Sequence, residues 1–101
     1  MIHITKDNYD AEVVSSDKPV LIDFGAPWCG PCKQVAKLVK ELDAEQSAVK
    51  ICEVDIDQSP EIAAKLGVIS IPVLIFFKGG KPVERMAGLK SKAAVMAMIG
   101  K

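Results

Sequence analysis

The sequence predicts one layered domain in which helices pack on a sheet, of the α/β or α+β class. Helical and strand patterns alternate along the 101 residues, in the order β-α-β-α-β-α-β-β-α. Hydrophobic residues make up 50% of the chain and charged residues 26%, a balance typical of globular proteins. This length has room for a single domain, which we expect to span residues 1–101.

The first predicted elements are a strand, a helix and a buried strand. Residues 2–4 alternate apolar and polar side chains, and Thr5 or Asp7 is a candidate cap for a helix running to about Ser16. The apolar run 20–24 is typical of a central strand that is buried on both faces.

A long amphipathic helix and a further strand follow. Pro31 suits the first turn of a helix, because an N–H at that position lacks a helical partner anyway. Apolar residues then recur at i, i+3, i+4 and i+7, namely Val35, Leu38, Val39 and Leu42. We expect this helix to end near Gln46, and residues 49–56 to form the next strand.

The second half of the sequence predicts a helix, then a hairpin of two strands, then a last helix. Ser59 and Pro60 are typical of a helix start, and Gly67 of a helix end. Residues 73–77 and 83–87 read as strands joined by a tight turn at Gly79-Gly80. Ser91 is then a candidate cap for a last helix.

Charge and hydropathy exclude several classes of function. The formal net charge is zero and no basic run occurs, so we expect no binding to nucleic acid. The longest apolar run, at about residues 71–77, is far shorter than the ~20 residues that span a bilayer, and the N-terminus lacks a signal-peptide pattern. We therefore expect a cytoplasmic protein without membrane attachment.

The sharpest motif is Trp28-Cys29-Gly30-Pro31-Cys32. Two cysteines at this spacing can close a small disulfide ring. At a helix N-terminus the first sulfur meets partial positive charge and unpaired N–H groups, which stabilise a thiolate. We therefore predict Cys29 as the nucleophile and Cys32, less exposed, as the cysteine that resolves a mixed disulfide.

The alternative for this motif is half of a zinc site. Structural zinc takes four ligands, usually from two such pairs. The remaining candidates, Cys52 and His3, have no partner at ligand spacing, and Cys52 lies in an apolar strand where it packs as a small hydrophobe. We therefore expect no bound metal, and no other signal from His3.

Two further residues are informative. Asp23 interrupts the apolar run 20–24 and is either a proton shuttle for Cys32 or an acid at a strand end that faces water, and the sequence favours neither. Pro72 follows Ile71 at the start of a strand, where a trans peptide bond is the usual state.

These three features together resemble the thioredoxin family, and the resemblance covers essentially the whole chain. It implies a mixed, mostly five-stranded sheet flanked by about four helices, and an enzyme that reduces protein disulfides without a bound cofactor. By position, Cys29 matches the attacking cysteine, Cys32 the resolving cysteine and Asp23 the buried acid. Pro72 matches a cis proline that leaves the Ile71 backbone available to a substrate strand.

The resemblance also implies a docking surface and partners. Residues that match the uncharged surface around the family's disulfide are Trp28, Gly30, Pro31, Ile71 and Gly88. The implied electron donor is a thioredoxin reductase, and the implied targets include peroxiredoxins, ribonucleotide reductase and methionine sulfoxide reductases. We expect the protein to act as a monomer.

Three positions depart from the family pattern. Gly25 replaces a second tryptophan, which removes bulk beside the site. Lys37 replaces a proline that kinks the long helix, so a straighter helix is expected. Glu53 replaces a lysine near the buried acid, and a second carboxylate there would raise the pKa of Asp23.

Two rival functions remain at this stage. A disulfide-forming oxidase on the same fold would need a more oxidising cysteine pair, against which the Gly-Pro spacer argues. A binding module without redox turnover would not need both cysteines, and such a module would keep its role when Cys29 is replaced by serine.

Overall fold

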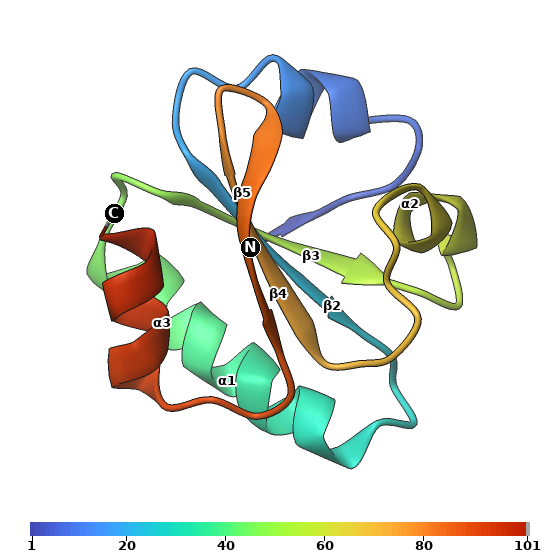
Figure 1. The fold of residues 1–101 in the computed structure, drawn as a ribbon, viewed down its shortest axis with the longest axis vertical. Helices are drawn as coiled ribbons and strands as arrows, with labels where there is room; N and C mark the ends of the chain where they lie inside the picture. Colours follow the sequence, from blue (N-terminus) through green and yellow to red (C-terminus); the bar gives the residue numbers. More distant parts are fainter. Residues whose placement is uncertain (101) are drawn as a thin grey trace.

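The computed structural model describes residues 1–100, and Lys101, the last residue of the predicted domain, lies outside them (Figure 1). The strands are β1 (Ile2–His3), β2 (Val20–Gly25), β3 (Lys50–Asp55), β4 (Val73–Lys78) and β5 (Lys81–Ala87). The helices are η1 (Asp10–Val14), α1 (Gly30–Glu45), α2 (Pro60–Lys65) and α3 (Lys92–Ile99). Within the described residues no helix is both long and apolar enough to cross a membrane.

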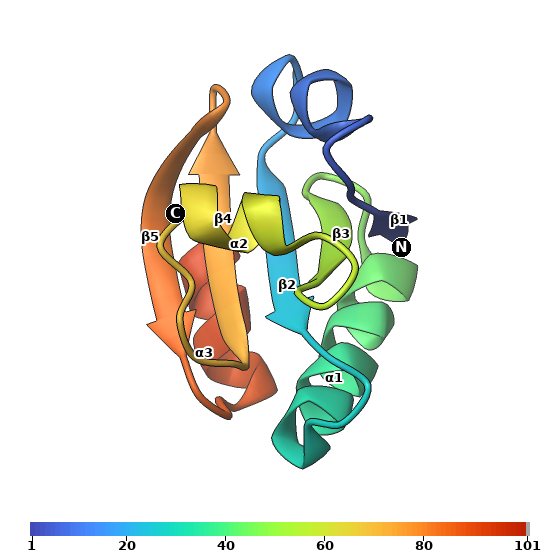
Figure 2. The same ribbon diagram turned by 90° about the vertical axis from the view of Figure 1, so that its right-hand side faces the viewer.

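The strands form one mixed sheet in the order β1-β3-β2-β4-β5 (Figure 2). Strands β1 and β2 both run parallel to β3, whereas β4 runs antiparallel to β2 and β5 antiparallel to β4. This arrangement confirms the mixed five-stranded sheet, with its flanking helices, that the family resemblance implied.

Helices cover both faces of the sheet, α1 and α3 one face and η1 and α2 the other (Figure 1). Each interface has its own apolar core. Leu21 packs with residues of α1 and α3, while Ile22 and Phe24 pack with residues of η1 and α2. Successive side chains of a strand point to opposite faces, so β2 is buried on both, as its apolar run predicted.

Helix starts follow the sequence signals only in part. The prediction of a helix from Thr5 or Asp7 to Ser16 is wrong in extent, because regular helix is confined to the π-helix η1. The Thr5 hydroxyl does accept the Asp7 N–H at 3.2 Å, as a capping side chain would, but residues 6–8 form turns ahead of η1. The predicted cap of α3 is confirmed, since Ser91 Oγ accepts from the Ala94 N–H at 3.1 Å.

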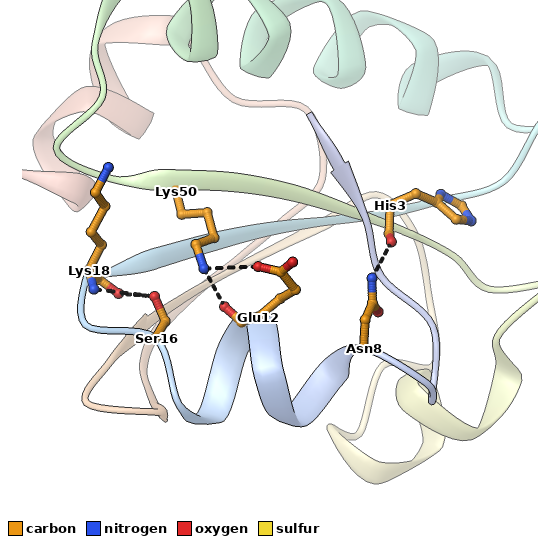
Figure 3. A network of polar contacts seen from close by, with 6 residues as sticks. All are labelled: His3, Asn8, Glu12, Ser16, Lys18 and Lys50. Atoms are coloured by element: carbon orange, nitrogen blue, oxygen red, sulfur yellow. Dashed lines mark hydrogen bonds and ion pairs between the residues drawn. The ribbon is translucent and has the colours of Figure 1, made fainter.

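Polar contacts attach η1 to the sheet (Figure 3). Lys50 Nζ on β3 donates to the Glu12 carbonyl at 2.9 Å and pairs with Glu12 Oε1 at 3.1 Å. The Asn8 side chain donates to the carbonyl of His3 on β1 at 2.9 Å. These bonds fasten the N-terminal segment to the first strands of the sheet.

Strand register brings three loops to one end of the sheet. Phe24 near the end of β2 is paired with Val73 at the start of β4, and Val73 is paired with Ala87 at the end of β5. The segment after β2, which carries the cysteine motif, therefore lies at the same end of the sheet as Pro72 and Gly88.

Candidate active site

The cysteine pair lies where β2 passes into α1. Cys29 is the N-cap residue of α1, and Pro31 occupies the first turn, as predicted. Cys29 and Cys32 form a disulfide with their Cα atoms 5.3 Å apart. The Cys32 N–H donates to Cys29 Sγ at 3.2 Å, so the sulfur takes the capping position that a serine or aspartate oxygen often fills.

Both sulfur-bearing residues are shielded in this disulfide state. Cys29 is 7% exposed and Cys32 is 4% exposed, so Cys32 is the less accessible of the two. A donor N–H and the positive end of the α1 dipole together stabilise negative charge at Cys29 Sγ. The local structure therefore favours Cys29 as the sulfur that carries a thiolate.

Asp23 is a buried acid of β2. Asp23 is 5% exposed, and its Oδ1 has no hydrogen-bond partner among the described residues. Burial, and secondarily the charge of Glu53, raises the pKa of Asp23 to about 7. The alternative of a water-facing acid at a strand end is thereby excluded, and the expected influence of Glu53 is confirmed.

A cavity of about 250 Å³ joins Asp23 to the second cysteine. Its lining includes Asp23, Cys32, Glu53 and Gly25. A Cβ atom placed on Gly25 would lie 3.2 Å from Cys32 Cβ and 3.5 Å from its Sγ. The glycine therefore leaves space beside Cys32, in keeping with the predicted loss of bulk at this position.

The predicted docking residues come from three loops at this end of the sheet. Trp28 is 68% exposed, and the Ile71–Pro72 peptide bond is cis, as the resemblance implied. Gly88 has a positive φ of 83° and donates its N–H to the Pro72 carbonyl at 2.9 Å. Gly30 opens α1 beside Cys29. The indole of Trp28 is thus an exposed apolar group at this end of the sheet.

Sequence reasoning missed two residues of this region. Asp57 Oδ2 accepts a bond from Trp28 Nε1 at 2.8 Å and so fixes the indole. His3 lines the cavity with Asp23, although no sequence signal was read from it. Neither contact follows a local spacing, because each joins segments far apart in the chain. Cys52 is fully buried in the core, as predicted, and burial raises the pKa of its thiol to about 12.

A buried acid beside a helix-capping cysteine pair, on a mixed sheet, defines a thiol–disulfide oxidoreductase. The profile of the thioredoxin family matches residues 1–101. The chain belongs to the thioredoxin family and is a protein-disulfide oxidoreductase.

Relatives from several bacteria support this assignment. The thioredoxin of Mycobacterium tuberculosis (strain ATCC 25618 / H37Rv) is 46% identical over 94% of this chain and 83% of its own length. The thioredoxin of Bacillus subtilis (strain 168) is 42% identical over 100% of this chain and 96% of its own length. A bifunctional thioredoxin reductase/thioredoxin of Mycobacterium leprae is 47% identical over 94% of this chain, which spans only 21% of that protein.

Proposed function

We propose that the protein reduces disulfides of other proteins by dithiol exchange, with Cys29 attacking, Cys32 resolving and Asp23 moving the proton. The observation that carries the proposal is the Cys32 N–H donated to Cys29 Sγ at the start of α1, with Asp23 and Cys32 lining one cavity behind it. A single domain over residues 1–101 suffices for this chemistry.

The exchange proceeds in two steps. The Cys29 thiolate attacks one sulfur of a target disulfide, forming a mixed disulfide and releasing the other target sulfur as a thiolate. Cys32 then loses its proton and attacks Cys29 Sγ. The mixed disulfide breaks, the second target thiolate leaves, and the pair closes to the disulfide seen in the structure.

Asp23 serves the second step as a base. The carboxyl lies in the cavity that Cys32 also lines, and its pKa, raised to about 7 by burial and Glu53, suits proton transfer near neutral pH. A carboxyl with an ordinary pKa would be a weaker acceptor for a thiol proton. Burial of Asp23 therefore contributes directly to the proposed chemistry.

Target proteins dock on the uncharged surface around the disulfide. This surface comprises Trp28, Gly30, Pro31, Ile71, Pro72 and Gly88. Trp28 supplies an exposed aromatic face that Asp57 holds in place, and aromatic residues are favoured at protein interfaces. Because the surface lacks charge, it discriminates little among partner sequences.

The proposed partners are those of a dithiol reductase. A thioredoxin reductase supplies electrons, in line with the bifunctional thioredoxin reductase/thioredoxin of Mycobacterium leprae, whose name combines the two activities. Peroxiredoxins, ribonucleotide reductase and methionine sulfoxide reductases are the proposed targets. We propose a cytoplasmic monomer that needs no bound cofactor or metal.

The test replaces each cysteine separately and follows reduction of a protein disulfide. Cys29→Ser should abolish turnover, whereas Cys32→Ser should accumulate a mixed disulfide at Cys29 that mass spectrometry detects. Cys52→Ser is the matched control, and its turnover should match that of the unaltered protein. Retained turnover in Cys29→Ser would contradict the proposal and favour a role without redox chemistry.

A further inference from the structure

The cavity beside Cys32 contains a polar group without a described partner. Asp23 Oδ1 is buried and accepts no hydrogen bond from any residue in 1–100. The cavity, at about 250 Å³, has room for several waters of roughly 30 Å³ each. Water in this cavity therefore offers a proton on Asp23 a route to solvent that does not cross the apolar core.

A polar row leads from Asp23 to the surface across three strands. Glu53 on β3 pairs in register with Asp23 on β2 and with His3 on β1. Directly opposed residues of neighbouring strands point to the same face of the sheet. All three side chains line the cavity, and exposure rises from 5% at Asp23 to 38% and 43% at the side chains of Glu53 and His3.

The imidazole of His3 lies between Gln58 and Glu53. His3 Nε2 lies 3.1 Å from Gln58 Oε1, and in the tautomer with its hydrogen on Nε2 this nitrogen donates to that oxygen. Nδ1 then keeps a lone pair, and it lies 3.7 Å from Glu53 Oε1. The ring points away from Asn8, which holds the His3 backbone (Figure 3).

We propose that Glu53 and His3 carry the proton of Cys32 from Asp23 to solvent. The proposal rests on the roles proposed above for the cysteines and Asp23. As Cys32 attacks Cys29 Sγ, its proton passes to the Asp23 carboxylate. It then moves through cavity water to the Glu53 carboxylate, to His3 Nδ1 and to bulk water, while the electron pair leaves with the target thiolate. When a reductase reduces the disulfide, the same path runs in reverse.

Two other charged residues line the cavity. Asp55 Oδ1 accepts the N–H groups of Asp57 and Gln58 at 2.9 and 3.4 Å, so it is engaged in the turn after β3. Lys33 on α1 has an ammonium group, which has no lone pair to accept a proton. Neither residue lies in the row that joins Asp23 to His3.

The test separates a proton path from a purely electrostatic effect of Glu53. The reduced protein is mixed with an aromatic disulfide, and release of the coloured thiolate is followed by stopped flow. A first phase that depends on disulfide concentration reports attack by Cys29, and a concentration-independent second phase reports resolution by Cys32. Both phases are measured as a function of pH for Glu53→Gln, His3→Gln and the control Glu61→Gln, which lies on α2 outside the cavity.

The two explanations predict opposite signs. Removing the charge of Glu53 relieves its repulsion of the Asp23 carboxylate, so an electrostatic role alone predicts faster resolution below about pH 7. A proton path predicts resolution about tenfold slower in Glu53→Gln and in His3→Gln, less than the ~10²–10⁴-fold effect of losing a general base. Added imidazole should restore His3→Gln, and Glu61→Gln should behave as the unaltered protein.

Other outcomes overturn the proposal. Resolution that is unchanged or faster in Glu53→Gln contradicts the path, and slowing in Glu53→Gln without slowing in His3→Gln removes His3 from it. If the unaltered protein releases only one thiolate per molecule and forms no Cys29–Cys32 disulfide, the proposed function itself fails. The two failures are therefore distinguishable in one experiment.

Discussion

Asp23 occupies a position in β2 between Ile22 and Phe24, both fully buried. Its raised pKa has a consequence for stability. In the unfolded chain the carboxyl titrates near its ordinary value of 3.8, and in the folded protein at about 7. Between these two values the folded state binds more protons, so the free energy of unfolding must fall as pH rises across this window.

Replacing Asp23 by asparagine should remove this dependence. We expect Asp23→Asn to raise the free energy of unfolding near and above pH 7 by roughly 1–3 kcal/mol, since the amide needs no charge in the core but still lacks a bond at Oδ1. Resolution by Cys32 should slow at the same time. Denaturant unfolding at a series of pH values checks stability, and an NMR titration that places the Asp23 carboxyl near pH 4 would contradict the account.

Cys52 should behave as a core residue. Its thiol is fully buried and its pKa is raised to about 12, so a thiol-alkylating reagent should modify the reduced protein at Cys29 within minutes and at Cys52 only after unfolding. Mass spectrometry of peptides after timed alkylation measures both rates. Equal rates at the two cysteines in the native protein would contradict the described core.

At the scale of residues, the sequence predicted the sites that depend only on residues close together in the chain. Cys29, Cys32 and Pro31 follow from one short motif and the start of one helix. Local pattern leaves the burial of Asp23 open, and the role proposed for His3 depends on a strand pairing with Glu53 across 50 residues of chain. Register of that kind is set by tertiary packing and is absent from local patterns.

The attachment of η1 to β3 offers a prediction at the scale of elements. Lys50 makes two bonds to Glu12, one to its backbone carbonyl and one to its side chain. Glu12→Gln removes only the ion pair and should cost less than about 1 kcal/mol. Lys50→Met keeps the unbranched stem, loses both bonds and should cost about 1–2 kcal/mol.

Thermal or denaturant unfolding of both variants at neutral pH provides the measurement. The ordering of the two variants is the decisive result. Equal losses would mean that the bond from Lys50 to the Glu12 carbonyl contributes nothing to the attachment of η1.

Elements with strong periodic patterns were predicted well, whereas weakly patterned segments were not. The apolar repeat of α1 and the buried runs of β2 and β4 fixed these elements to within a residue or two. The N-terminal helix was predicted too long, because residues 6–8 form turns and η1 begins only at Asp10. Ser59 precedes α2 as predicted, but its side chain makes no capping bond.

At the scale of the whole molecule, the mixed strand order could not be obtained from periodicity alone. The apolar run of β2 predicted a central strand, but a strand pattern does not reveal that its neighbours are β3 and β4. That position matters for function, because it brings the cysteine motif, Pro72 and Gly88 to the same end of the sheet.

The direction of electron flow is the central claim about the whole molecule, and the redox potential of the Cys29–Cys32 pair tests it most directly. Trp28 is the only tryptophan and precedes Cys29, so its fluorescence should follow equilibration against glutathione buffers. We expect a potential near or below about −230 mV, from which electrons pass to more oxidising disulfides. A potential of roughly −120 to −180 mV would contradict the account and place the protein among disulfide oxidases and isomerases.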